Sequence, residues 1–163
     1  MINSNQPLLP SVLDRLLDDR PDQKHDQERS RGQNLAALRD AMRRDLEALM
    51  NTRRRCISPP AGLKELETSL VEYGIPDVLS ASAGSEEVRE GLRRSIENVI
   101  RRFEPRFKTV TVKLLGDAPQ QDRTLRFRID ALMYAEPAPE FVSFDSLLDP
   151  ATSNFSVIGR RDG

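Results

Sequence analysis

The sequence predicts an α+β fold in which N-terminal helices precede a small, mainly antiparallel sheet that packs on them. Apolar residues recur at helical spacing in the segments between residues 34 and 103. After Pro105 the period changes to two, which is typical of strands with one buried face. Because a sheet that is apolar on one face buries that face against helices, these observations predict one layer of each.

The N-terminal segment differs in composition from the rest of the 163-residue chain. We assign residues 1–33 to a short helix and a polar linker, and residues 34–163 to one α+β domain. Leu13, Leu16 and Leu17 follow the helix start signal Ser11 at helical spacing. Residues 18–33 contain no aliphatic or aromatic side chain. The three leucines therefore either fold back onto the domain or form an arm that docks on a partner.

Three helices are expected in the domain, over residues 34–51, 63–73 and 85–103. Their apolar stripes are Leu35, Leu38, Met42, Leu46 and Leu49; Leu63, Leu66, Leu70 and Tyr73; and Val88, Leu92, Ile96, Val99, Ile100 and Phe103. Gly74 is the expected end of the second helix, and Ser85 is the expected N-cap of the third. Asp45 borders the first stripe, where a carboxylate either faces water or is half buried and paired with an arginine.

Three strands are expected over residues 110–114, 125–133 and 141–144. The tail over residues 154–158 also alternates polar and apolar residues. This tail either closes the sheet itself or leaves an open edge that pairs with a strand from another chain. The candidate residues for such strand pairing are Val142, Phe144, Phe155 and Val157.

The composition argues against several classes of function. The formal net charge is −1, whereas a dedicated nucleic-acid binder usually carries a basic excess. One cysteine and one histidine exclude a Cys/His metal cage and an intramolecular disulfide. We find no phosphate-binding loop, no secretory signal and no membrane-spanning run. The sequence therefore predicts a cytoplasmic binding protein with no catalytic, cofactor or metal residues.

The tripeptide Glu104-Pro105-Arg106 follows the third expected helix. Pro105 ends the helix at or before Glu104, so a carboxylate lies at the negative end of the helix dipole, where it is disfavoured. One interpretation is a local ion pair of Glu104 with Arg101 or Arg106. The other is a rigid corner that presents a carboxylate and a guanidinium to a partner.

The chain resembles the TssE proteins, which are type VI secretion baseplate subunits related to the wedge protein of contractile phage tails. The matching segments occur in the family's order and lie at residues 13–16, 43–53, 73–77, 103–106, 125–129 and 144–145. The segment Phe103-Glu104-Pro105-Arg106 resembles the family's Glu-Pro-Arg signature. The resemblance covers about residues 8 to 150.

The resemblance implies a non-enzymatic baseplate part that assembles in the cytoplasm at the inner face of the cell envelope. It implies docking on a wedge of TssF and TssG, with Glu104, Pro105 and Arg106 as the docking residues. Six wedges around the tail tube would carry six copies of the chain. The family also resembles the interlocking domain of the sheath subunits TssB and TssC, which favours an open sheet edge that templates sheath assembly.

The alternative is a lysozyme-like cell-wall hydrolase, a label that such proteins often carry. A glycosidase needs two carboxylates across a cleft, one of them with a raised pKa. Nearly all carboxylates of this chain lie on polar helix faces or in expected loops. The residues themselves give no support to hydrolase activity.

Overall fold

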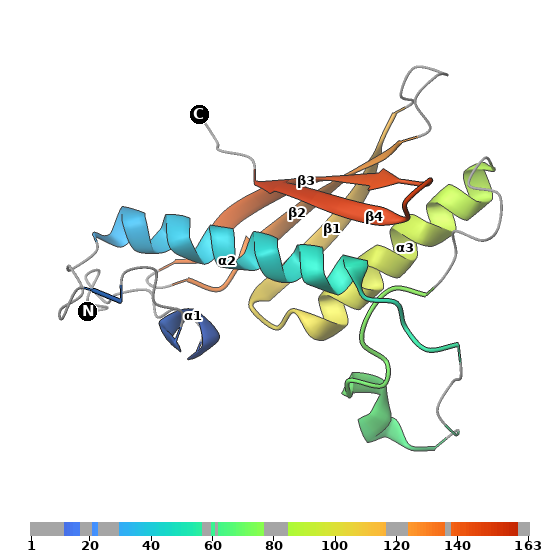
Figure 1. The fold of residues 1–163 in the computed structure, drawn as a ribbon, viewed down its shortest axis with the longest axis horizontal. Helices are drawn as coiled ribbons and strands as arrows, with labels where there is room; N and C mark the ends of the chain where they lie inside the picture. The colour runs from blue at the N-terminus through green and yellow to red at the C-terminus, as the bar shows by residue number, and fades with distance from the viewer. Residues whose placement is uncertain are drawn as a thin grey trace.

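Two long helices and one four-stranded sheet form the body of the protein (Figure 1). The computed structural model describes residues 12–16, 21–22, 30–56, 60, 62–76, 85–116, 124–135 and 138–159. Its elements are α1 (Val12–Leu16), α2 (Arg31–Asn51), the 3₁₀ helix η1 (Lys64–Thr68), α3 (Glu86–Phe103), β1 (Phe107–Leu115), β2 (Leu125–Met133), β3 (Glu140–Asp149) and β4 (Asn154–Gly159). All strand pairs are antiparallel, in the order β1-β2-β3-β4. The predicted α+β class is confirmed.

The core lies between the helices and one face of the sheet, because α2 packs against β4 and α3 packs against β1. The fully buried large side chains come from both layers and include Met42, Leu46 and Met50 of α2, Leu92, Ile96 and Ile100 of α3, and Phe127, Ile129, Met133, Phe144 and Leu148 of the sheet. The apolar stripes predicted for α2 and α3 therefore form the core.

Helix α2 begins earlier than predicted, because Ser30 and Gln33 form a reciprocal pair of hydrogen bonds at its start. The backbone N–H of Gln33 donates to Ser30 Oγ (3.4 Å), and the backbone N–H of Ser30 donates to Gln33 Oε1 (2.8 Å). This capping box satisfies donors at the start of the helix, so the helix begins at Arg31 instead of Asn34. The predicted linker over residues 18–33 is therefore wrong for its last three residues.

Helix α3 has the predicted bounds and caps. Ser85 Oγ accepts from the backbone N–H of Val88 (3.3 Å), and Glu86 and Glu87 lie in the first turn, where the helix dipole favours acidic groups. The helix ends at Phe103, two residues before Pro105. None of the helices in the described ranges has the length and apolarity needed to cross a membrane.

The helix predicted over residues 63–73 is wrong. The structure has only the short 3₁₀ helix η1 there, and Leu70 is 87 % exposed. The helical spacing of the leucines is real, but short helices depend on tertiary burial. Of this stripe Tyr73 packs against the core, whereas Leu63 and Leu70 are exposed. The segment is held by its end, where Ile75 N–H donates to Thr52 O (2.9 Å) and Ile75 O accepts from Arg54 N–H (3.0 Å).

The outer face of the sheet is polar, as the period-two pattern predicts. Lys113 Nζ and Ser143 Oγ both donate to the Asp130 carboxylate, at 2.9 and 2.8 Å, and Arg128 Nε donates to Asp145 (2.9 Å). Burial alone would raise the pKa of Asp130, but these hydrogen bonds outweigh it and lower the pKa. The carboxylate therefore stays ionised and joins neighbouring strands.

The tail over residues 154–158 closes the sheet of its own chain as strand β4, so that alternative is confirmed. The predicted third strand extends to Asp149, and its residues 144–148 lie between β2 and β4. Phe144 is paired with Ile129 on one side and with Gly159 on the other. The prediction that residues 141–144 form a free edge is therefore wrong for Phe144, because the tail covers it.

Helix α1 of the N-terminal arm exposes its apolar side chains. Val12, Leu13 and Leu16 are all more than half exposed. Leu17, the third leucine of the predicted arm, lies outside the described residues. The side chains of Val12, Leu13 and Leu16 do not belong to the hydrophobic core of the described residues.

Candidate functional site

The Glu-Pro-Arg segment forms the corner at which α3 ends and β1 begins. Glu104 caps α3 with its backbone N–H donating to Ile100 O (2.9 Å). Two residues later, Arg106 O accepts from the N–H of Tyr134, next to the end of β2 (2.9 Å). Pro105 fixes the turn between them. The chain therefore reverses from the helix into the sheet within three residues.

Arg106 joins two carboxylates that lie 59 positions apart in the sequence, Asp45 on α2 and Glu104 at the corner. Its Nε donates to Glu104 Oε1 (2.6 Å), and its Nη2 donates both to Glu104 Oε2 and to Asp45 Oδ2 (2.6 Å). This arrangement confirms the local pair of Glu104 with Arg106 and the half-buried, arginine-paired Asp45. The charge cluster connects α2, the end of α3 and the start of β1.

The Glu104 carboxylate faces inward, because the residue is only 6 % exposed. As a consequence, the interpretation in which the corner offers this carboxylate to a partner does not fit the isolated chain. The carboxylate at a helix C-terminus is explained by Arg106, whose bidentate pair compensates both the burial and the helix dipole. No described residue contacts Arg106 Nη1, so this is the part of the motif with a donor to spare.

The electrostatics of the cluster keep Arg106 charged and the neighbouring Tyr73 neutral. The hydrogen bonds that Arg106 donates to Glu104, aided by Asp45, raise the pKa of Arg106 even though burial opposes this. Burial raises the pKa of Tyr73, and the negative charges of Asp45 and Glu104 raise it further. The Tyr73 phenol therefore stays neutral, and its ring packs edge-on against Phe103. Both carboxylates of this charge cluster are paired with Arg106, so the cluster acts as a structural clasp between described elements.

A second buried charge lies beside the corner and was missed by sequence reasoning. Glu72 is 9 % exposed and pairs with Arg54 (3.1 Å) and with Arg102 of α3 (3.9 Å). These pairs tie the segment that carries η1 to α3. No sequence pattern indicates these pairs, because Glu72 lies in a stretch whose fold was wrongly predicted.

The predicted strand-pairing residues lie at the other end of the sheet, on β3 and β4, so the structure does not bring them near the corner. All four side chains, those of Val142, Phe144, Phe155 and Val157, are buried in the core. A partner chain therefore cannot contact these side chains. Only their backbone groups can take part in pairing.

Side chains of α2 form hydrogen bonds with backbone groups at the outer edge of β4. The Asn51 amide donates to Phe155 O (2.9 Å) and accepts from Phe155 N–H (2.8 Å), and Arg43 Nη1 donates to Val157 O (3.3 Å). One amide thus provides the donor and the acceptor that a neighbouring strand would provide. Polar residues along a helix usually face water, so the sequence pattern did not single out Asn51 and Arg43 as contacts of the sheet.

A family model described as "Baseplate wedge protein gp25" matches residues 36–138, which is more than half of the chain. The match runs from α2 through β2 and includes the corner. No curated protein matches the chain significantly. A solved chain of the baseplate complex from the type VI secretion system is similar at 17 % sequence identity and a TM-score of 0.46. That likeness covers 66 % of this chain and 90 % of the solved one.

Proposed function

Because the chain belongs to the baseplate wedge protein gp25 family, we propose that it is a non-enzymatic structural subunit of a type VI secretion baseplate. The observation that carries this proposal is the family match over residues 36–138. The clasp around Arg106 supports a structural role, because it joins α2 to the corner between α3 and β1 and pairs both of its carboxylates. In keeping with the TssE resemblance, the subunit would assemble in the cytoplasm.

The partner in this proposal is the wedge formed by TssF and TssG. Docking takes place at the corner, where Pro105 is exposed and Arg106 Nη1 can donate to an acceptor on the partner. Glu104 acts through Arg106, since its own carboxylate is buried. The exposed leucines Leu13 and Leu16 of α1, continued by Leu17, provide a second contact.

Co-purification with wedge subunits tests the docking. The informative variant combines Glu104→Gln with Arg106→Met, because it removes the guanidinium together with the Glu104 charge and so leaves no unpaired charge at position 104. We expect this variant to fold and to lose wedge binding, whereas the unchanged chain binds. A folded double variant that still co-purifies with TssF and TssG would exclude Arg106 as a docking residue. Purified chain should show no muramidase turnover, and measurable turnover would favour the hydrolase alternative.

We further propose that the outer edge of β4 templates assembly of the TssB and TssC sheath by strand pairing. Antiparallel pairing needs outward N–H and C=O groups, and Phe155 and Val157 have theirs on this side. The neutral Asn51 amide is exchangeable, because an incoming strand replaces its donor and its acceptor one for one. Val142 and Phe144 contribute by holding β3 in the core.

A proline at position 157 tests strand pairing at the β4 edge while it leaves the pairing of β4 with β3 in place. The N–H of Val157 lies on the outer side of β4, so Val157→Pro removes an edge donor without breaking the ladder to β3. We expect Val157→Pro to block sheath ring formation on purified baseplates while wedge binding persists. The matched control is Val157→Ala, which shortens the same side chain but keeps the N–H and should support assembly. Equal ring formation by both variants would contradict strand pairing here.

A further inference from the structure

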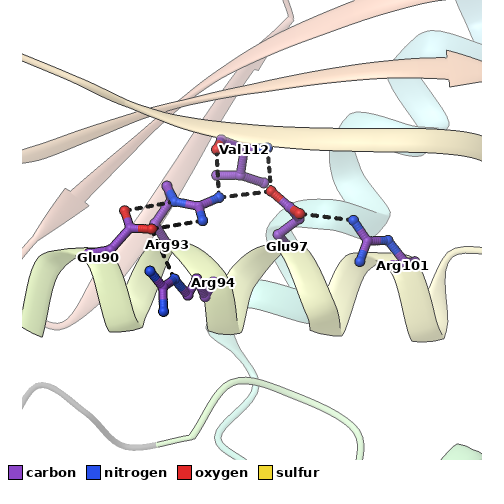
Figure 2. Close-up of polar contacts among 6 residues, drawn as sticks. All are labelled: Glu90, Arg93, Arg94, Glu97, Arg101 and Val112. Carbon is purple, nitrogen blue, oxygen red and sulfur yellow. Dashed lines mark hydrogen bonds and ion pairs between the residues drawn. The ribbon is translucent and has the colours of Figure 1, made fainter.

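Strand β1 forms the opposite edge of the sheet, and α3 occupies its backbone at Val112 (Figure 2). The backbone N–H of Val112 donates to Glu97 Oε2 (3.1 Å), and Val112 O accepts from Arg93 Nη1 (3.0 Å). These groups point away from β2, since Val112 is paired with Ile129 on the inner side. Two side chains one helical turn apart thus take the place of a neighbouring strand.

A network of charges holds the two side chains in this position (Figure 2). Arg93 donates to Glu97 (2.8 Å) and, through two nitrogens, to Glu90 (2.8 and 2.9 Å), while Arg101 donates to the other oxygen of Glu97 (2.8 Å). The Arg93 and Glu97 side chains are each only about one fifth exposed. The i, i+3 and i, i+4 spacings let one helix face build the whole network.

The network keeps its carboxylates ionised at neutral pH. Hydrogen bonds led by that from Arg93 lower the pKa of Glu90 to about 2. Burial would raise the pKa of Glu97, but the Val112 amide and the guanidiniums of Arg101 and Arg93 outweigh burial and lower it. An ionised Glu97 is the stronger acceptor for a backbone N–H.

The position of this contact matters for strand addition. Val112 lies in the middle of the nine-residue strand β1, and residues of an antiparallel pair exchange two hydrogen bonds at every second position. An incoming strand therefore cannot form a continuous ladder along β1 while Val112 is occupied. Natural proteins often close exposed edges in this way, because an open edge pairs with other chains.

We infer that Arg93 and Glu97 form an edge cap that prevents β1 from pairing with β1 of a second copy of this chain. The self-complementary arrangement is an antiparallel two-fold pair centred on Val112, in which Thr111 faces Lys113 and no charges of like sign oppose each other. The β4 edge is covered differently, by the neutral Asn51 amide at Phe155 and by the Arg43 guanidinium at Val157. The inference concerns the free chain and does not rest on the proposed function.

Amide hydrogen exchange and sedimentation of the purified chain test the cap. In the unchanged chain we expect Val112 N–H to exchange as slowly as amides bonded within the ladder, although no strand lies beside it. Glu97→Ala should speed its exchange by about tenfold or more at concentrations where the chain is monomeric. At higher concentrations it should produce a dimer, in which the second copy bonds Val112 again. Glu97→Gln should restore protection and the monomer, because an amide oxygen still accepts the bond. The control Arg94→Ala, on an exposed residue of the same helix that does not touch β1, should change neither.

Three outcomes would overturn the inference. The first is fast exchange of Val112 in the unchanged chain, which needs no variant. The second is a Glu97→Ala chain that stays monomeric at every concentration. The third is a dimer formed equally by Glu97→Gln, which would show that charge, and not the backbone contact, keeps the copies apart. All three can be seen without TssF, TssG or sheath subunits, so they are distinct from a failure of the docking proposal.

Discussion

Replacing Arg106 with alanine is expected to lower the free energy of unfolding by about 3 kcal/mol. The change removes the guanidinium that compensates the buried Glu104 carboxylate, and it also deprives Asp45 on α2 of its contact with the corner. Removing one partner of a buried pair costs about 3–5 kcal/mol, and we expect the lower end because a quarter of the Arg106 side chain is exposed. Urea denaturation of the isolated chain measures the loss.

Two further variants show whether this loss of stability comes from the buried charge. Arg101→Ala also deletes an arginine paired with a glutamate, but the Arg101 side chain is 59 % exposed, so we expect a loss of at most about 0.5 kcal/mol. Glu104→Gln combined with Arg106→Met should recover most of the stability lost by Arg106→Ala. If Arg106→Ala is no worse than Arg101→Ala, the corner is not a stabilising clasp.

The elements that the sequence predicted well are those with local signals. Helix α3 combines an N-cap at Ser85, acidic residues in its first turn and a proline after its end, so each boundary has a cause within a few residues. The start of α2 also had such a signal, Ser30 followed by Gln33, but the polar composition around it led to its assignment as linker. Strand alternation likewise predicted which faces of β1 and β2 are buried.

The wrong or missing predictions concern contacts between residues that are distant in sequence. The stripe over residues 63–73 has true helical spacing, yet a stripe forms a helix in water only where a neighbouring surface buries it. Sequence showed that Glu104 breaks a local rule, but only the fold shows that Arg106 and Asp45 resolve it. Asn51 and Glu97 look like ordinary polar helix positions, and their edge contacts emerge only when the strands are in place.

Replacing Gly74 with alanine is expected to cost about 3 kcal/mol and to loosen the segment that carries η1. Gly74 has a φ of +102°, which side chains rarely adopt, and an added Cβ would lie 2.4 Å from Thr52 O. Thr52 O is the acceptor for the N–H of the buried Ile75, so relief of the clash breaks the backbone bridge between the two segments. Urea denaturation gives the loss, and faster amide exchange at Ile75 shows where it arises.

Gly62→Ala is the matched control, because it separates the backbone cost from the clash. Gly62 has nearly the same φ, +99°, but a Cβ there would meet no atom within 4 Å. We expect Gly62→Ala to cost about 1 kcal/mol from the backbone conformation alone and to leave the exchange of Ile75 unchanged. The difference between the two variants then measures the close approach to Thr52. Equal losses would mean that the approach of Gly74 to Thr52 is not what anchors this segment, and that Glu72 and its two arginines hold it instead.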